Sequence, residues 1–418
     1  MYRKDTLSNG IRVVSETLPK TRSLSIGVWV KVGSRHEPKE ISGISHFIEH
    51  MFFKGTKKRS ARDIATEVDS LGGEMNAFTS QENTTYYIKV LDEHLPAAVD
   101  ILSDILLGSR FDAADMEKER KVILEEIKGV EDTPDDFIHE LFTATVWPDN
   151  SLGRPILGTK ETIKALKHAD ILKYIEDYYI PREIVISVAG NFDHAKLIDL
   201  LEKAFGRLSR KGVPKQEIAP VFSRAVTVKK KQLEQVQVCL GCKGLHYTHE
   251  DRFVIMALNT ILGNSMSSRL FQEVREQNAL AYSIYSYVTA YRDAGLVTVY
   301  AGTDPANANE AMGLIVKELR KIRDEGITPA EEKRVKDQIK GNLVLSLETS
   351  NSHMGRIARQ EIYFGKYLSV DDIIRSVDKV SAEQVHRLAR QLFTAENLSL
   401  SILGPMNKAD LPDSLLEI

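Results

Sequence analysis

The chain has 418 residues, of which 56 are Lys or Arg and 59 are Asp or Glu, so its net charge is −3 at pH 7. This balance gives no basic surplus for binding nucleic acid or an anionic membrane. Two cysteines are too few for a disulfide scaffold, and no apolar run approaches the ~20 residues of a membrane helix or forms a signal peptide at the start. We therefore expect a cytoplasmic protein of two or three domains that binds neither nucleic acid nor membrane.

Strand and helix patterns alternate along the first part of the chain. Asn9-Gly10 predicts a tight turn between two strands, and Ser60 with Asp63 resembles a capping box at the start of a helix. The expected strands cover residues 11–14, 23–32, 84–91 and 184–188, and the expected helices cover 43–53, 61–71, 97–107 and 112–130. This mixture predicts an α/β or α+β class.

The two halves of the chain resemble each other weakly. Residues 166–191 and 380–405 both set a helix, a loop, a strand and a glycine in the same order. Residues 111–123 and 327–339 form a second pair of capped, charged helices at nearly the same separation. Chance similarity is the alternative for the second pair, but two matches at nearly one offset favour a duplication.

A change of composition separates these halves. The stretch around residues 207–224 is basic and polar, contains glycine and proline, and shows little periodicity, which is typical of a linker. We expect a first half at residues 1–208, a linker at 209–224 and a second half at 225–418.

The motif that carries chemistry is HFIEH, which runs from His46 to His50. Histidines at positions i and i+4 project from the same face of a helix, so His46 and His50 can hold one zinc ion. Glu49 lies beside them, where a general base for peptide hydrolysis belongs. The alternative is a helix with two satisfied histidines and a solvated glutamate, but the surrounding residues are apolar and indicate a buried helix.

A catalytic zinc ion needs a third protein ligand. On the expected helix at residues 115–130, the helical period places Glu119 and Glu126 near the apolar stripe and turns Glu125 away from it. Buried carboxylates are costly unless they are paired or bound to metal. Beside the histidine motif we therefore expect Glu126 to be the ligand and Glu119 to orient a histidine. An amphipathic helix with flanking salt bridges is the alternative.

These motifs together resemble the M16 family of zinc peptidases. The resemblance rests on HFIEH, the following Lys54-Gly55-Thr56, Asn76-Ala77-Phe78-Thr79 and ERKVILEEI at residues 119–127, and it covers essentially the whole chain. The chain is most similar to the processing-peptidase-like M16B subfamily, including its bacterial members. The family spacing places its third ligand at Glu126 and an acidic partner at Glu119, in agreement with the helical-face argument.

The resemblance implies an α+β fold of the LuxS/MPP-like metallohydrolase type. It has two homologous halves, each a mostly antiparallel sheet with helices packed on one side. One zinc ion per chain is implied for the first half and none for the second, where no HxxEH recurs. The resemblance also implies that two chains, an identical pair or two related M16 chains, close around a chamber. We expect a homodimer.

The resemblance further implies residues that bind substrate. Peptide substrates of the family lie as an extended strand along a sheet edge, which here corresponds to the segment around Asn76 and Ala77. Arg275 and Tyr282 match a pair from the second half that would stabilise the oxyanion at the scissile carbonyl. Without the resemblance, Arg275 would be an ordinary surface residue and Asn76-Ala77 a plain strand or turn.

Two other signals are weaker. Cys239 and Cys242 form a lone CxxC in an alternating strand, for which packing is favoured over a redox or metal site. Lys54, Lys57, Lys58 and Arg59 form a basic cluster near the motif, which could bias substrates or could be a solvated loop.

The expected function is that of a zinc endopeptidase acting on unfolded or short polypeptides. The alternative is a non-catalytic structural or peptide-binding homologue of the same fold. Because His46, Glu49, His50 and Glu126 are all present, the enzyme is favoured.

Overall fold

The computed structural model describes residues 1–412 and 414–418, and these divide into two compact units. The first unit comprises Met1–Gly129, Arg154–Glu217 and Ser346–Tyr367. The second unit comprises Val130–Gly153, Ile218–Leu345 and Leu368–Ile418. Each unit has its own sheet and its own hydrophobic core.

The sheet of the first unit has the strand order β1-β2-β6-β3-β5-β4. Its strands are β1 (Tyr2–Thr6), β2 (Arg12–Thr17), β3 (Ser23–Val30), β4 (Glu74–Thr79), β5 (Thr84–Leu91) and β6 (Ile184–Gly190). β2 and β6 are parallel, and the other neighbouring strands are antiparallel. β3 and β6 lie in the middle of the sheet and are buried on both faces, which suits their β-branched and apolar residues.

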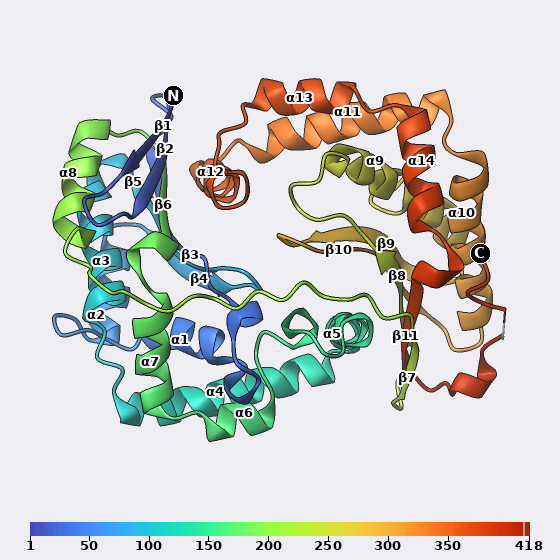
Figure 1. Ribbon diagram of the computed structural model, residues 1–418, viewed down its shortest axis with the longest axis horizontal. Helices are drawn as coiled ribbons and strands as arrows, with labels where there is room; N and C mark the ends of the chain where they lie inside the picture. Colours follow the sequence, from blue (N-terminus) through green and yellow to red (C-terminus); the bar gives the residue numbers. More distant parts are fainter. Residues whose placement is uncertain (413) are drawn as a thin grey trace. The chain divides into compact units, whose positions relative to one another are not determined.

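Helices cover both faces of this sheet (Figure 1). The helices of the first unit are α1 (Ile44–Phe52), α2 (Ala61–Ser70), α3 (Leu95–Gly108), most of α4 (Ala113–Asp132), α6 (Lys160–Ala165), α7 (His168–Tyr178), α8 (His194–Phe205) and α12 (Ser350–Phe364). The main core lies between the sheet and the helices from the first part of the chain. α12 alone comes from the later part, and it packs on β2, β3 and β6.

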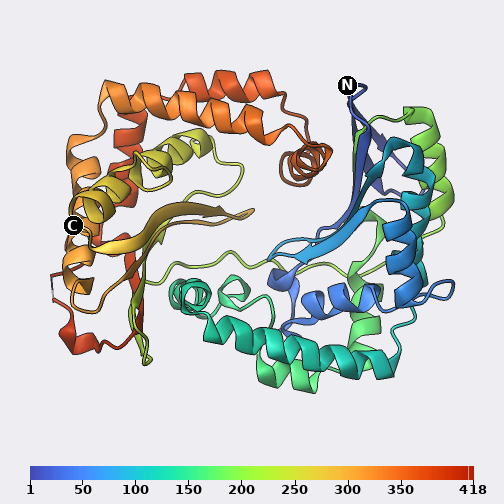
Figure 2. The same cartoon turned by 180° about the vertical axis from the view of Figure 1, so that it is seen from behind.

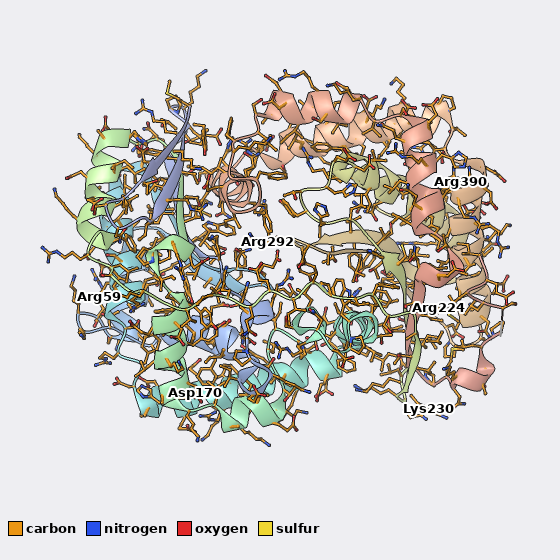
Figure 3. The ribbon with its side chains drawn as sticks, in the orientation of Figure 1. Arg59, Asp170, Arg224, Lys230, Arg292 and Arg390 are labelled. Atoms are coloured by element: carbon orange, nitrogen blue, oxygen red, sulfur yellow. The ribbon has the colours of Figure 1, made fainter. Side chains whose placement is uncertain are left out.

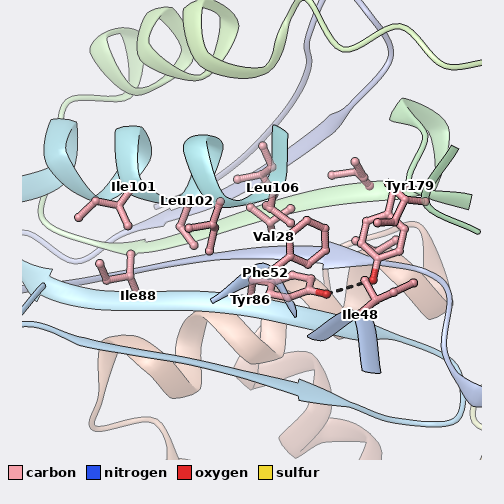
Figure 4. Packing of buried hydrophobic residues seen from close by; sticks show 14 of the residues in the cluster. Val28, Ile48, Phe52, Tyr86, Ile88, Ile101, Leu102, Leu106 and Tyr179 are labelled. Carbon is pink, nitrogen blue, oxygen red and sulfur yellow. Dashed lines mark hydrogen bonds between the residues drawn. The ribbon is translucent and has the colours of Figure 1, made fainter. Parts of the chain in front are cut away.

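Aromatic rings join α1 to the main core of the first unit (Figure 4). The ring of Phe52 meets the ring of Tyr86 edge to face, with 5.1 Å between centroids. The hydroxyl of Tyr86 lies 3.0 Å from the hydroxyl of Tyr179, so the buried phenols satisfy each other. Because Phe52 is the last residue of α1, this packing holds the helix that carries the histidine motif.

The sheet of the second unit has the strand order β7-β11-β8-β10-β9. Its strands are β7 (Val226–Lys230), β8 (Val236–Lys243), β9 (Ala281–Ala290), β10 (Gly295–Thr303) and β11 (Leu398–Gly404). The helices of this unit are α5 (Pro134–Val146), α9 (Arg252–Leu262), α10 (Ala308–Glu325), nearly all of α11 (Pro329–Ser346), α13 (Val370–Asp378) and α14 (Ala382–Leu392).

Strands β2 to β6 of the first sheet and strands β7 to β11 of the second share one topology, which supports the predicted duplication, and β1 is an additional edge strand of the first sheet. β7 and β11 form the parallel pair of the second sheet, as β2 and β6 do in the first. β8, β10 and β9 then follow antiparallel, as β3, β5 and β4 do. Gly190 and Gly404 are the last residues of equivalent strands. α4 and α11 are equivalent helices, because each is the second α-helix after an equivalent strand, β5 or β10. The predicted α+β class, with two homologous halves and mostly antiparallel sheets, is confirmed. Most helices pack on one side of each sheet, as expected, but α12 and α5 each cover the other face of a sheet.

Each unit also takes one helix from the opposite half of the chain (Figures 1 and 2). α5 precedes the expected linker but packs on β8 and β11, where Ile138, Phe142 and Val146 join a cluster with Cys239 and Leu403. α12 follows the linker but packs on the first sheet, with Met354, Ile357, Ala358 and Ile362 against Val14, Trp29 and Val185. The expected division at residues 209–224 cuts the chain once, in sequence order. The compact units differ from it by these two helices, because α5 and α12 each cover an apolar sheet face of the unit formed mainly by the other half.

The elements expected from the sequence are present with small shifts at their ends. The capping box of α2 forms in both directions: Asp63 N–H donates to Ser60 Oγ (3.1 Å) and Ser60 N–H donates to Asp63 Oδ2 (2.9 Å). Cys239 and Cys242 are buried free thiols on β8. No described helix is both long enough and apolar enough to cross a membrane.

Candidate metal centre

The histidine motif lies on α1, whose start is fixed by a buried carboxylate. Both oxygens of Glu37 accept backbone N–H groups of the first turn, from Gly43 (2.7 Å) and Ser45 (2.8 Å). Burial raises the pKa of Glu37 to about 7, although these hydrogen bonds work against the rise. Gly43 has φ 95, and a Cβ there would meet the carbonyl oxygen of Leu157, so only glycine fits this position.

The two histidines of the motif meet a glutamate from α4. His46 Nε2 lies 3.8 Å from Glu126 Oε2, and His50 Nε2 lies 3.6 Å from the same oxygen. The ligand atoms of these three residues lie within 4.8 Å of one another. Glu125 is exposed and pairs instead with Lys128 on the same helix. The structure therefore brings Glu126, and not its neighbour, to the histidines.

The donor set fits zinc. Two atoms bonded to a tetrahedral zinc ion at about 2.0–2.1 Å lie roughly 3.4 Å apart, close to the separations between Glu126 Oε2 and the two Nε2 atoms. Glu126 Oε2 is buried and has no hydrogen-bond partner among the described residues. A buried carboxylate oxygen without a partner is costly, and a cation between the three groups would satisfy it.

Glu119 determines which ring nitrogen of His50 faces Glu126. Glu119 Oε2 lies 3.1 Å from His50 Nδ1, and the other oxygen, Oε1, lies 2.7 Å from Lys54 Nζ. A carboxylate accepts hydrogen bonds, so Nδ1 of His50 is the donor in this contact, and Nε2 is the nitrogen that faces Glu126. Glu119 is buried in α4, with 6% of its surface exposed.

The pKa of His46 is well below its ordinary value. Burial, with a smaller contribution from His50, lowers the pKa of His46 to about 3. An imidazole must be unprotonated at the nitrogen that binds a metal, so this shift suits a ligand.

Glu49 lies on the same helix, and its carboxylate is held by strand β4. Thr79 Oγ1 donates a hydrogen bond of 2.6 Å to Glu49 Oε2. Burial raises the pKa of Glu49 above its ordinary value, and the Thr79 hydroxyl and His50 oppose the rise. A carboxylate with a raised pKa is suited to taking and returning a proton.

Asn76 and Ala77 lie on β4, the strand that supplies Thr79. Within the described residues β4 pairs with β5 alone, so its other edge offers backbone groups for a further strand. Asn76 is exposed, and its side chain accepts from the N–H of Ala77 (2.8 Å).

Arg275 and Tyr282 form a pair in the second unit. Arg275 lies on a π-helical segment, Phe271–Gln277, and Tyr282 lies at an irregular point of β9, where the pairing with β10 shifts register. The guanidinium carbon lies 5.4 Å from the centre of the Tyr282 ring, a cation–π distance. Tyr282 is 79% exposed. π-Helical turns are frequent at functional sites.

Sequence reasoning missed three residues of this centre. The sequence motif Asn76–Thr79 includes Thr79 but indicates no role for it, and the sequence alone places Lys54 in a basic cluster. Glu37 lies seven residues before the first residue of α1, too far for the usual capping pattern. Only Thr79 carried a sequence signal, since strand alternation places it on the same face as Ala77.

The comparisons with known proteins agree over most of the chain. Residues 12–160 match the insulinase family (peptidase family M16), and residues 165–339 match the peptidase M16 inactive domain. The chain is 46% identical to a Bacillus subtilis protein called uncharacterized zinc protease YmxG, over 97% of this chain and 98% of the relative. It is 42% identical to the uncharacterized zinc protease SCO5738 of Streptomyces coelicolor, over 97% and 90% of the two chains.

Solved structures give the same result. A protease from Helicobacter pylori superposes with a TM-score of 0.90 at 27% identity, covering 97% of this chain and 99% of the other. A peptidase M16 inactive domain from Pseudomonas fluorescens superposes with a TM-score of 0.91 at 15% identity, over 97% and 98%, and supports the fold. From the sequence matches and this fold we conclude that the chain belongs to peptidase family M16.

Proposed function

We propose that this protein is a zinc-dependent endopeptidase that hydrolyses peptide bonds of unfolded or short polypeptides. The observation that carries the proposal is the convergence of His46 Nε2, His50 Nε2 and Glu126 Oε2 beside the carboxylate of Glu49. Membership of family M16 and the zinc protease names of its relatives support it.

Each residue of the centre has a role in this proposal. His46, His50 and Glu126 hold one zinc ion per chain, and Glu119 orients His50 through Nδ1. Zinc, when bound, supplies a Lewis acid for the attacking water and the scissile carbonyl. Glu49 takes the proton of the attacking water on its carboxylate and returns it to the leaving amine nitrogen, while Thr79 holds that carboxylate in place.

The substrate lies as an extended strand along β4 in this proposal. The open edge of β4 supports backbone pairing near Asn76 and Ala77, and such pairing tolerates many sequences because it uses no side chains. Arg275 and Tyr282 bind substrate as a cation and a phenol donor.

The active species is proposed to be a cytoplasmic homodimer, or a pair with a related M16 chain, by analogy with the two-chain members of the family. Sedimentation of the active protein tests this point. The alternative function is that of a non-catalytic structural or peptide-binding homologue, which would keep the fold without hydrolysing peptides.

Metal analysis combined with hydrolysis of an unfolded polypeptide tests the function. We expect the wild type to hold one zinc ion per chain and to cleave internal peptide bonds. Glu49→Gln should keep the zinc ion and lose roughly 10²–10⁴-fold in hydrolysis, because the general base is missing. Glu126→Gln should lose both.

Glu125→Gln is the matched control, since this neighbour is exposed and pairs with Lys128. It should leave zinc content and hydrolysis unchanged. Full hydrolysis by Glu49→Gln would remove Glu49 from the mechanism. A zinc-loaded wild type without peptidase activity would favour the non-catalytic alternative.

A further inference from the structure

The basic cluster after the histidine motif separates into members with different partners. Arg59, labelled in Figure 3, precedes α2 and binds the carboxylates of Glu67 on α2 and of Asp100 and Asp104 on α3. Lys58 is mostly exposed and lies 3.7 Å from Asp100. These contacts concern the packing of helices. Lys54 differs, because its partner is Glu119, the residue that contacts His50.

Lys54 is held close to the metal centre by the end of α1. Its backbone N–H donates to the carbonyl oxygen of Met51 (3.2 Å), which continues the last turn of the helix. Its side chain reaches α4, where Nζ lies 2.7 Å from Glu119 Oε1. The side chain of Glu119 is 8% exposed and that of Lys54 is 34% exposed, so the ammonium closes the solvent side of a buried carboxylate.

Each oxygen of the Glu119 carboxylate therefore contacts a different residue. Oε1 accepts from Lys54, and Oε2 accepts from His50 Nδ1. A carboxylate fixed at both oxygens cannot turn to offer one of them to a cation near Nε2. It also holds the imidazole ring in one orientation, since the contact at Nδ1 sets the direction of Nε2.

We propose that Lys54 is a positioning residue of the metal centre, which acts through Glu119 to set the orientation of His50. The proposal rests on the proposed function in one respect, that His50 is a zinc ligand. Buried ion pairs gain little net stability but are costly to break on one side, because the remaining charge is left alone. Removal of Lys54 therefore releases Glu119 from its fixed position and weakens the hold on His50.

Zinc affinity, measured by competition with a chromophoric chelator, tests the proposal. Loss of partners that orient ligands typically weakens metal affinity roughly 10–100-fold, and Lys54→Met should lie near the lower end because Glu119 remains. Lys54→Arg keeps a charged donor and should restore most of the affinity. Lys58→Met is the matched control and should leave the affinity unchanged. Should Lys54→Met not fold, Lys54→Ala gives the same comparison without the longer side chain.

A double-mutant cycle with Glu119→Gln shows whether Lys54 acts through Glu119. We expect the double variant to bind zinc about as weakly as Glu119→Gln alone, because the two residues form one connection to His50. The proposal would be overturned if the losses of zinc affinity in the two single variants multiplied in the double variant. An unchanged zinc affinity in Lys54→Met would also overturn it. Thermal unfolding of the zinc-free variants measures the stability that is lost with the ion pair, and zinc affinity is compared at a temperature at which every variant is folded, so that a weaker affinity does not reflect unfolding.

The same measurement distinguishes this inference from the proposed function. If His50→Ala and Glu126→Gln still bind zinc like the wild type, the ligand assignment itself is wrong. If they lose zinc while Lys54→Met keeps full affinity, only the role of Lys54 is wrong.

Discussion

The carboxylate of Glu49 connects the motif helix with the strand proposed to bind substrate. Its raised pKa results mainly from burial, and Thr79 from β4 donates a short hydrogen bond to it. The same strand carries Asn76 and Ala77. A peptide added to the edge of β4 would thus lie on the element that aims the base, which couples substrate position to proton transfer.

Thr79→Val tests this link at the scale of one hydroxyl group. A hydrogen bond to a charged group contributes about 1.5–3 kcal/mol, so kcat/KM for an unfolded polypeptide should fall about tenfold or more. Zinc content should remain that of the wild type, because Thr79 contacts none of the proposed ligands. Thr79→Ser keeps the hydroxyl and should retain most activity. Equal activity in the valine and serine variants would contradict the role of the hydroxyl.

At the scale of elements, equivalent helices of the two units explain why a candidate metal centre lies in only one unit of the part of the chain that the structure describes. The repeat that aligns residues 111–123 with 327–339 places Val335 of α11 where α4 has Glu119. Val335 is buried in the second core, whereas Glu119 is buried against His50 and Lys54. α9, which follows β8 as α1 follows β3, has no histidine. The same position of equivalent helices therefore contributes to an apolar core in the second unit and to a polar centre in the first.

The start of α11 predicts a pH dependence of stability. Burial alone would raise the pKa of Glu331, but hydrogen bonds from Arg269 and from the N–H and hydroxyl of Thr328 lower it to about 2, against an ordinary value of 4.5. Between these values the unfolded chain binds more protons than the folded one. The contribution is therefore complete above pH 4.5 and is lost as the pH falls toward 2.

We expect Glu331→Gln to lower the thermal unfolding midpoint at about pH 6 and to flatten its decline between about pH 5 and pH 3. Glu325→Gln, an exposed position nearby, is the control and should follow the wild-type profile. A Glu331→Gln profile parallel to that of the wild type over this range would contradict the assignment.

At the scale of the whole molecule, the exchanged helices make each unit depend on both halves of the chain. α12 covers a face of the first sheet that includes Val14 and Trp29, and Trp29 is 3% exposed. Arg356 and His353 of α12 also bind Glu16, a carboxylate buried on β2. Without α12 this face would present apolar side chains and an unpaired charge to water.

Residues 1–208 expressed alone should therefore be unstable or aggregate, although they contain the whole candidate metal centre. A synthetic peptide of residues 346–367 should bind this fragment and raise its thermal unfolding midpoint. The same peptide with Ile357→Asp, which places a charge in the apolar contact, should not. A fragment 1–208 that is stable without the peptide would show that α12 is dispensable for the first unit.

The sequence by itself determined the local features and, through them, the chemistry. The spacing of His46, Glu49 and His50 fixes one face of a helix, and the helical period alone separates Glu119 and Glu126 from Glu125, because side-chain direction within a helix depends only on sequence distance. The duplication and the α+β class followed from repeated orders of short patterns in the same way.

Only the tertiary structure decided which distant segments meet. Lys54 and Lys58 belong to the same basic cluster in the sequence, yet one contacts Glu119 and the other lies near Asp100. The contact of Thr79 with Glu49 and the exchange of α5 and α12 are of the same kind. These long-range contacts form when apolar faces and charged groups of separate elements are removed from water together. They therefore depend on the complete fold and not on the local sequence.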